Sequence, residues 1–253
     1  MGKVAFVFDG VGTQYPGMGK EFYDRFYAIK QQLLYLEQFR VGSLRTMFHS
    51  SYVELDNSDD LYPALFLADL ASYLMLEKNN IKADAVVGFG IGELMAISAS
   101  GMLSYDEGFQ FACEKSDIFA EVNRYKTMFQ TSGTVRELSR EIELKRKLVD
   151  GSDYILREPL IPVYSVKRAN KYPDNLEGIV DVLSGDIFEP NSWKDTIIQM
   201  NRDGVDVFVE CGPGDSLSYS INKILRNVTT YQTKDLDSLE KTIKGLKQNR
   251  HSF

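Results

Sequence analysis

The stretch Ala85-Val-Val-Gly-Phe-Gly-Ile-Gly-Glu93 decides the fold of this chain. A dense apolar run ends at a glycine-rich turn, and a helical pattern then runs from Glu93 to Ser100. The segment Val4–Phe8 has the same form, because it is an apolar run followed by a loop rich in glycine. Apolar runs of this kind are typical of strands buried on both faces, and repeated strand–turn–helix units build a parallel α/β sheet. Functional residues of such sheets usually lie at the carboxyl ends of the strands.

The rest of the chain continues this alternation as one α/β domain over residues 1–246, followed by a polar tail at 247–253. Helices are predicted over residues 20–39, 64–80, 105–125, 134–149, 190–203 and 236–246, and from Gly212-Pro-Gly214 to about Leu225. Further strands are predicted over residues 161–164, 205–209 and 228–231. The sequence contains neither an internal repeat nor a low-complexity linker.

Composition excludes several classes of protein. The chain has 253 residues, 43% hydrophobic and 26% charged, with a net charge of −7, which fits a globular protein and disfavours binding to nucleic acid or to an anionic membrane. The first apolar run is too short for a signal peptide, and no stretch approaches the roughly 18 apolar residues of a membrane span. Cys113 and Cys211 lie far apart without metal-ligand spacing, so we expect free thiols, no metal or cofactor, and a cytoplasmic location.

Three kinds of site can contain a turn like Gly88-Phe-Gly-Ile-Gly92. A dinucleotide fingerprint needs glycine where Glu93 stands, and a P-loop is not matched at Gly19-Lys20 because Glu21 follows. A nucleophile elbow, Gly-x-Ser-x-Gly, keeps both flanking glycines here but has Gly90 in place of the serine. A plain glycine turn that lets a helix pack on a sheet predicts the same residues.

Several segments in order resemble the malonyl-CoA:acyl carrier protein transacylase family, which includes polyketide acyltransferase domains. The matching segments are Phe6-Val-Phe-Asp-Gly-Val-Gly-Thr-Gln-Tyr-Pro-Gly-Met-Gly19, Tyr62-Pro-Ala-Leu-Phe66, Ala83-Asp-Ala-Val-Val-Gly-Phe-Gly-Ile-Gly-Glu93, Ile161-Pro-Val-Tyr-Ser165, Pro190-Asn-Ser-Trp193 and Gly204-Val-Asp-Val-Phe-Val-Glu-Cys-Gly-Pro-Gly214. The resemblance extends from Val4 to about Leu225. It implies a three-layer acyltransferase core around a short parallel sheet.

The resemblance also implies a chemistry whose residues this chain lacks. Family members form an acyl-serine ester that a histidine helps to make, and then pass the acyl group to the thiol of a carrier protein. The serine position is Gly90 and the histidine before it is Phe89. The nearest counterpart of the family's Phe-His-Ser segment is Phe129-Gln-Thr-Ser132, which has no histidine. Losing both serine and histidine removes the covalent route, because either loss alone costs on the order of 10⁴-fold or more in rate.

The remaining positions of the family's site are also altered. In the first loop, Gly10–Gly19, Val11 stands where the family has glutamine. Lys115 stands where the family has the arginine that pairs with the malonyl carboxylate, and it keeps the charge but not the bidentate fork. The resemblance places substrate-binding positions at Val11, Gly12, Thr13, Ile91, Glu93 and Lys115. The two histidines of the chain, His49 and His251, fall outside the family's catalytic segments and are expected at the surface.

Asp9 and Cys211 are the candidates for an alternative chemistry. Asp9 stands beside the first loop, where the family has proline, and Cys211 precedes the Gly-Pro-Gly loop. A thiol is nucleophilic, but no histidine is available to lower its pKa, so a buried structural role is the competing interpretation. The family's ferredoxin-like subdomain, inserted before the Phe-His-Ser segment, is predicted to be largely deleted because only a few residues are left for it.

The leading hypothesis is a non-catalytic acyltransferase homologue that binds a partner in fatty-acid or polyketide-type biosynthesis. Candidate partners are an acyl carrier protein, a condensing enzyme or another acyltransferase-like subunit, with self-association as a further option. The alternative is a divergent acyl-CoA- or carrier-dependent acyltransferase or thioesterase that uses a non-serine mechanism. A third option is a subunit whose site is completed by a partner.

Overall fold

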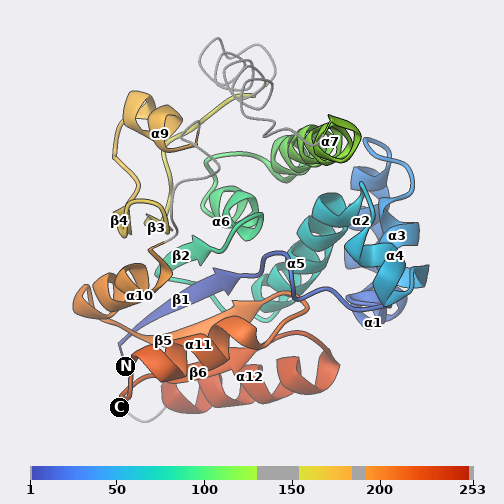
Figure 1. The fold of residues 1–253 in the computed structure, drawn as a ribbon. Helices are drawn as coiled ribbons and strands as arrows, with labels where there is room; N and C mark the ends of the chain where they lie inside the picture. The colour runs from blue at the N-terminus through green and yellow to red at the C-terminus, as the bar shows by residue number, and fades with distance from the viewer. Residues whose placement is uncertain (1, 130–153, 184–191, 251–253) are drawn as a thin grey trace.

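The protein is described by a computed structural model over residues 2–129, 154–183 and 192–250 (Figure 1). Its strands are β1 (Lys3–Phe8), β2 (Ala85–Gly88), β3 (Val163–Ser165), β4 (Asn170–Lys171), β5 (Val205–Cys211) and β6 (Thr229–Gln232). Its helices are α1 (Lys20–Arg25), α2 (Tyr27–Glu37), α3 (Ser43–His49), α4 (Tyr52–Asp56), α5 (Leu61–Lys78), α6 (Gly92–Ala99), α7 (Tyr105–Phe129), α9 (Leu176–Leu183), α10 (Trp193–Arg202), α11 (Ser216–Ile224) and α12 (Leu236–Arg250).

One six-stranded sheet organises these elements in the order β4-β3-β2-β1-β5-β6. All neighbouring strands are parallel except β3 and β4, which are antiparallel. The central strand β1 pairs with β2 on one side, with Phe8 opposite Gly88, and with β5 on the other, with Phe8 opposite Cys211. The predicted parallel α/β fold is therefore confirmed, and the carboxyl ends of β1, β2 and β5 meet at one edge.

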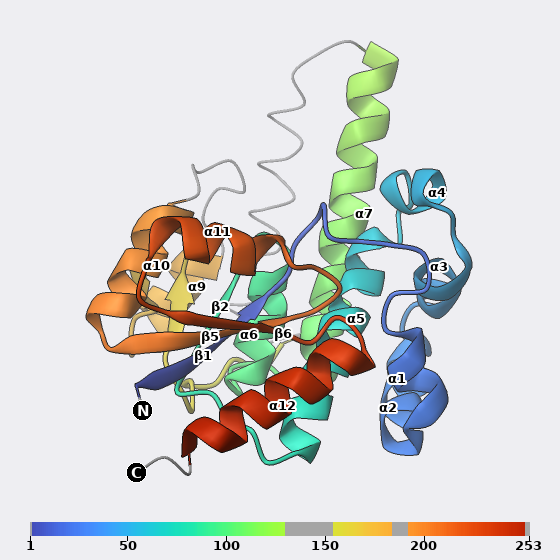
Figure 2. The same ribbon diagram turned by 90° about the horizontal axis from the view of Figure 1, so that it is seen from below.

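Both faces of the sheet are covered by helices. Successive side chains of a strand point to opposite faces, so the apolar strands give each face a hydrophobic core. Val4, Phe6 and Phe8 of β1 pack into a core shared with α2, α3, α5, α6, α7 and α12. Ala5 and Val7 pack into a second core under α10 and α11. The resulting layers are seen edge-on in Figure 2, where α7 projects beyond the rest of the molecule.

Several element boundaries differ from the sequence-based expectations. The helix predicted over residues 20–39 is two helices, since Phe26 between them has an extended backbone (φ −120°, ψ 104°). Helix α5 begins at Leu61, ahead of the predicted start at residue 64, with Pro63 in its first turn, where proline is tolerated. Helix α12 continues to Arg250, so the tail expected from residue 247 is partly helical. The helix predicted at 134–149 lies outside the described residues.

Among the described residues a single sheet is present, and α7 runs without a break from Tyr105 to Phe129. The loss of a second subdomain stays a prediction, because residues 130–153 lie outside the described residues. Within the same residues no helix is long and apolar enough to cross a membrane.

Candidate functional site

The turn between β2 and α6 is folded as an elbow around Gly90. Gly90 has a left-handed backbone (φ +60°), and a Cβ built on it would meet no atom within 4 Å. The two flanking glycines, Gly88 and Gly92, are instead enclosed by backbone atoms. A Cβ on Gly88 would lie 2.1 Å from the carbonyl carbon of Gly92, and one on Gly92 would lie 2.3 Å from the carbonyl oxygen of Asp9. The flanking glycines are thus required by close backbone packing, whereas the central position faces open space.

The first loop lies directly against this elbow. The Phe89 amide donates a hydrogen bond to the Phe8 carbonyl at 3.0 Å, and a Cβ on Gly10 would lie 2.4 Å from the Phe89 carbonyl oxygen. Within the loop, the Gly12 amide donates to Oε1 of Gln14 at 2.7 Å. That amide is consequently engaged by a side chain of the same loop. Val11 is 51% exposed beside it.

Two side chains of the elbow have structural partners. The ring of Phe89 packs edge-to-face on Trp193, with 5.6 Å between centroids. Glu93 is buried and accepts a hydrogen bond from the hydroxyl of Tyr172 at 2.6 Å. Burial, followed by the charge of Glu93, raises the pKa of Tyr172 well above its usual value, so the phenol stays protonated and joins α6 to the segment after β4.

Cys211 and Asp9 are both fully buried, at 0% exposure. The Sγ of Cys211 lies 3.6 Å from the Val209 carbonyl oxygen, and burial is the main cause that raises the pKa of its thiol well above the usual value. A thiolate is the nucleophilic form, so this environment opposes reactivity. The Asp9 side chain accepts a hydrogen bond from the Gly214 amide at 2.6 Å. It therefore points to the Gly-Pro-Gly loop and away from solvent.

The other predicted residues are placed as follows. Thr13 lies next to the Gly-Pro-Gly loop, because a Cβ on Gly214 would be 2.7 Å from its Cγ2. Ile91 is buried at the start of α6. Lys115 lies on α7 with its Nζ 5.4 Å from the ring centroid of Phe111. His49 is exposed at the end of α3. His251 and residues 130–132 lie outside the described residues.

Asp69 of α5 also lies at this edge, although the sequence patterns did not predict it as a site residue. Asp69 is 1% exposed, and a Cβ on Gly212 would lie 2.2 Å from its Oδ1 and 2.6 Å from Oδ2 of Asp9. The available signal was an aspartate inside an otherwise apolar helical stretch, Ala64 to Met75. A charged residue there is rarely fully buried without a specific reason.

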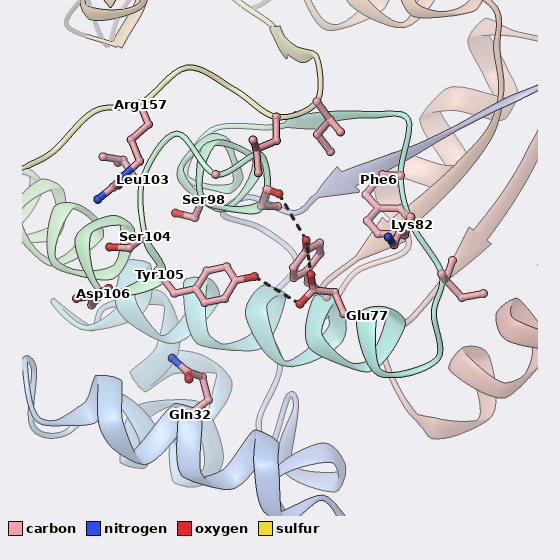
Figure 3. A pocket seen from close by; sticks show the side chains of 17 residues that line it. Phe6, Gln32, Glu77, Lys82, Ser98, Leu103, Ser104, Tyr105, Asp106 and Arg157 are labelled. Atoms are coloured by element: carbon pink, nitrogen blue, oxygen red, sulfur yellow. Dashed lines mark hydrogen bonds between the residues drawn. The ribbon is translucent and has the colours of Figure 1, made fainter.

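A cavity of about 590 Å³ lies away from the elbow. Figure 3 shows the side chains that line it. It is bounded by the ends of α5 and α6 and by the residues that precede β2, whereas the elbow follows β2. Inside it, Oε1 of Glu77 accepts from the Tyr73 hydroxyl at 3.0 Å, and Oε2 lies 3.5 Å from the Tyr105 hydroxyl. Burial, then the charge of Glu77, raises the pKa of Tyr105 to about 12. None of the predicted site residues lines this cavity.

Known proteins provide an independent comparison for this geometry. The model of the acyl transferase domain matches residues 5–147, which is more than half of the chain. The chain belongs to the acyl transferase domain family. The matched range contains the first loop, the elbow and Lys115, so the acyltransferase resemblance of the sequence is confirmed at the level of the family.

Individual relatives agree with this acyltransferase assignment. The polyketide biosynthesis acyltransferase homolog BaeD of Bacillus velezensis is 33% identical over 138 residues, an alignment that covers 51% of this chain and 43% of that protein. The malonyl CoA-acyl carrier protein transacylase of Bacillus subtilis is 23% identical over 315 aligned positions, covering 98% of each chain. This alignment is longer than the chain itself, so that relative carries segments that this acyltransferase homologue lacks.

The solved structures support the same fold. The malonyl CoA-acyl carrier protein transacylase of Clostridium perfringens superposes with a TM-score of 0.83, at 22% identity, over 98% of both chains. The arrangement of the sheet and its helices is therefore that of an acyltransferase core.

Proposed function

We propose that this chain is a non-catalytic acyltransferase homologue that binds a partner in polyketide or fatty-acid-type biosynthesis, in the cytoplasm. The observation that carries the proposal is the elbow itself. Its backbone is folded around Gly90, but that position offers no side-chain nucleophile. The aromatic contact of Phe89 with Trp193 and the hydrogen bond from Tyr172 to Glu93 give these residues packing roles instead.

The names of two relatives support a choice among the candidate partners. The Bacillus velezensis relative is called a polyketide biosynthesis acyltransferase homolog, and the name of the Bacillus subtilis relative includes acyl carrier protein. We therefore put an acyl carrier protein first among the partners, with a condensing enzyme or another acyltransferase-like subunit next. We assign this contact to the elbow edge, the surface formed by the first loop and the turn around Gly90. Val11 of the first loop and Gly90 of the turn are both exposed there.

Intact-protein mass spectrometry after incubation with malonyl-CoA tests the absence of catalysis. We expect no covalent malonyl adduct on the wild-type chain, while the Bacillus subtilis transacylase, run in parallel, should acylate. Gly90→Ser is the matched variant, since the added Cβ would meet no atom within 4 Å. Its rate of acylation should be lower than that of the transacylase by on the order of 10⁴-fold or more, because serine without its histidine is a weak nucleophile. A stable adduct on the wild-type chain would contradict the proposal.

Binding of a purified acyl carrier protein, measured by isothermal titration calorimetry, tests the partner and its surface. Val11→Glu should weaken binding about tenfold or more, because it places a charge in the centre of the assigned contact. Val41→Glu is the control, since Val41 is 83% exposed on the turn between α2 and α3. Equal affinities for the two variants would remove the elbow edge from the contact.

A further inference from the structure

Three carboxyl groups meet in the protein interior where β1 and β5 end. Asp9, Asp69 and Glu210 come from the end of β1, from α5 and from β5, and none is more than 1% exposed. The glycines of the following loop provide the space for them. Because Oδ1 of Asp69 and Oδ2 of Asp9 both lie within 2.6 Å of the Cβ position of Gly212, any side chain there would collide with the cluster.

Only Glu210 has the partners of an ionised carboxylate. Its oxygens accept hydrogen bonds from the amides of Leu217 at 2.9 Å and Ser218 at 2.7 Å, in the first turn of α11. Backbone donors at a helix N-terminus stabilise negative charge.

The two aspartates differ sharply from Glu210. Asp9 accepts one hydrogen bond, from the Gly214 amide, and its Oδ1 has no partner. Neither oxygen of Asp69 has a hydrogen-bond partner at all. Within the described residues no ion pair joins either aspartate to a lysine or arginine. Two unpaired negative charges beside Glu210, out of contact with water, would be strongly unfavourable.

We infer that Asp9 and Asp69 are held as neutral acids beside ionised Glu210. We infer also that this cluster makes the packing of the first loop and the Gly212–Gly214 loop on the carboxyl edge of the sheet depend on pH. Asp9 joins the start of the first loop to Gly214, and Glu210 joins β5 to α11. Loss of the two protons would place like charges against one another at the point where these segments meet. The first loop and the Gly212–Gly214 loop would then separate from the sheet edge.

The electrostatic surroundings support this assignment. Burial, followed by the charge of Glu210, raises the pKa of Asp9 well above its usual value, and burial, followed by the charge of Asp9, does so for Asp69. Asp215 adds a smaller repulsion on Asp9. The nearby thiol of Cys211 also has a raised pKa, chiefly through burial and then through Asp69. Lys234 also interacts electrostatically with Glu210, but its Nζ is paired with Asp215 at 2.6 Å.

The direction of the pH dependence follows from these pKa values. The folded state retains protons on Asp9 and Asp69 that the unfolded state releases near pH 3.8, their ordinary pKa. Stability is therefore greatest in acid and falls as the pH rises from about this value toward the raised folded pKa. A bound cation is the competing explanation for unpartnered carboxylate oxygens. The residues that the structure describes contain no group of three or more histidine, cysteine, aspartate or glutamate side chains arranged to hold a metal ion.

The test is the unfolding equilibrium of the wild-type chain, Asp69→Asn and Asp206→Asn between pH 5 and pH 9. For the wild type we expect the unfolding constant to rise with pH, by up to about tenfold per pH unit for each retained proton. Asp69→Asn should flatten this rise and become the more stable protein at high pH. Asp206→Asn is the matched control, because Oδ1 of Asp206 is also buried without a partner but lies at the other end of β5. It should keep the wild-type slope.

Infrared spectroscopy of the wild-type protein labelled at aspartate provides a second readout that needs no variant. A carbonyl band of protonated aspartic acid that persists at pH 5, above the ordinary pKa of 3.8, and is lost on titration to higher pH is the expected result. Its absence would overturn the inference, as would a pH-independent stability of the wild type. Saturable stabilisation by Mg²⁺ or Ca²⁺ at pH 7 that Asp69→Asn abolishes would also overturn it, because it would identify a cation site.

Discussion

At the scale of single residues, the elbow separates two roles that glycine can have. Gly88 and Gly92 are enclosed by backbone atoms, so they are needed for the sheet and α6 to pack closely. Gly90 adopts the left-handed backbone but has open space around it. Its lack of a side chain is thus a chemical difference from a Gly-x-Ser-x-Gly elbow and is not imposed by crowding.

This difference predicts unequal costs for the two alanine substitutions. Gly88→Ala should lower the free energy of unfolding by about 3 kcal/mol or more, because its Cβ would lie 2.1 Å from a backbone carbon. Gly90→Ala should lower it by about 1–2 kcal/mol, the cost of a left-handed backbone for an L-residue. Urea unfolding followed by the fluorescence of Trp193 measures both. Similar losses for the two variants would argue against an intact elbow.

At the scale of helices and strands, local patterns identified the long elements of the sheet and its covering helices, but they missed α3, α4, α9 and β4 and some element limits. The apolar runs at β1, β2 and β5 and the glycine turns after them were sufficient to predict a parallel sheet. The break at Phe26 was missed because no glycine or proline marks it, and its extended backbone accompanies packing of Phe26 on the core. The carboxyl cluster could not be predicted, since Asp9, Asp69 and Glu210 meet only when distant segments of the chain are folded together.

Glu107 in the first turn of α7 joins that helix to the segment that precedes β3. Its carboxylate accepts hydrogen bonds from the Ser104 amide at 2.7 Å, the Ile155 amide at 2.8 Å and Nη1 of Arg157 at 2.9 Å. Burial opposes ionisation, but the hydrogen bonds from Ser104, Ile155 and Arg157 outweigh it and lower the pKa of Glu107 to about 2.

Glu107→Gln should therefore lower the free energy of unfolding by about 1–2 kcal/mol at pH 7. The folded pKa lies below the ordinary value of 4.5, so this stabilisation is complete above that pH and is lost as the pH falls toward 2. The difference between variant and wild type should accordingly shrink between pH 5 and pH 3 in urea unfolding. Asp237→Asn is the control, since Asp237 forms an exposed ion pair with Lys241 and should cost less than about 0.5 kcal/mol. A pH-independent difference for Glu107→Gln would contradict this account.

At the scale of the whole molecule, one sheet connects two hydrophobic cores that share no buried residue. Phe6 faces the core beneath α5, α6 and α7, whereas Phe208 faces the core beneath α10 and α11. The two cores are joined by β1, whose alternate side chains enter both.

This arrangement predicts that the chain unfolds as a single cooperative domain. Phe6→Ala and Phe208→Ala remove fully buried rings from opposite faces, and each should lower the free energy of unfolding by about 3–5 kcal/mol. Trp193, the single tryptophan, packs against the second core, whereas circular dichroism reports on helices of both faces. If the strands couple the two cores, both probes should give one transition in urea, and each variant should shift both probes equally. A fluorescence transition that responds to Phe208→Ala but not to Phe6→Ala would show that the two faces unfold separately. In that case the core under α10 and α11 could unfold while the core under α5, α6 and α7 stays folded, and the strand β1 would not make the sheet one folding unit.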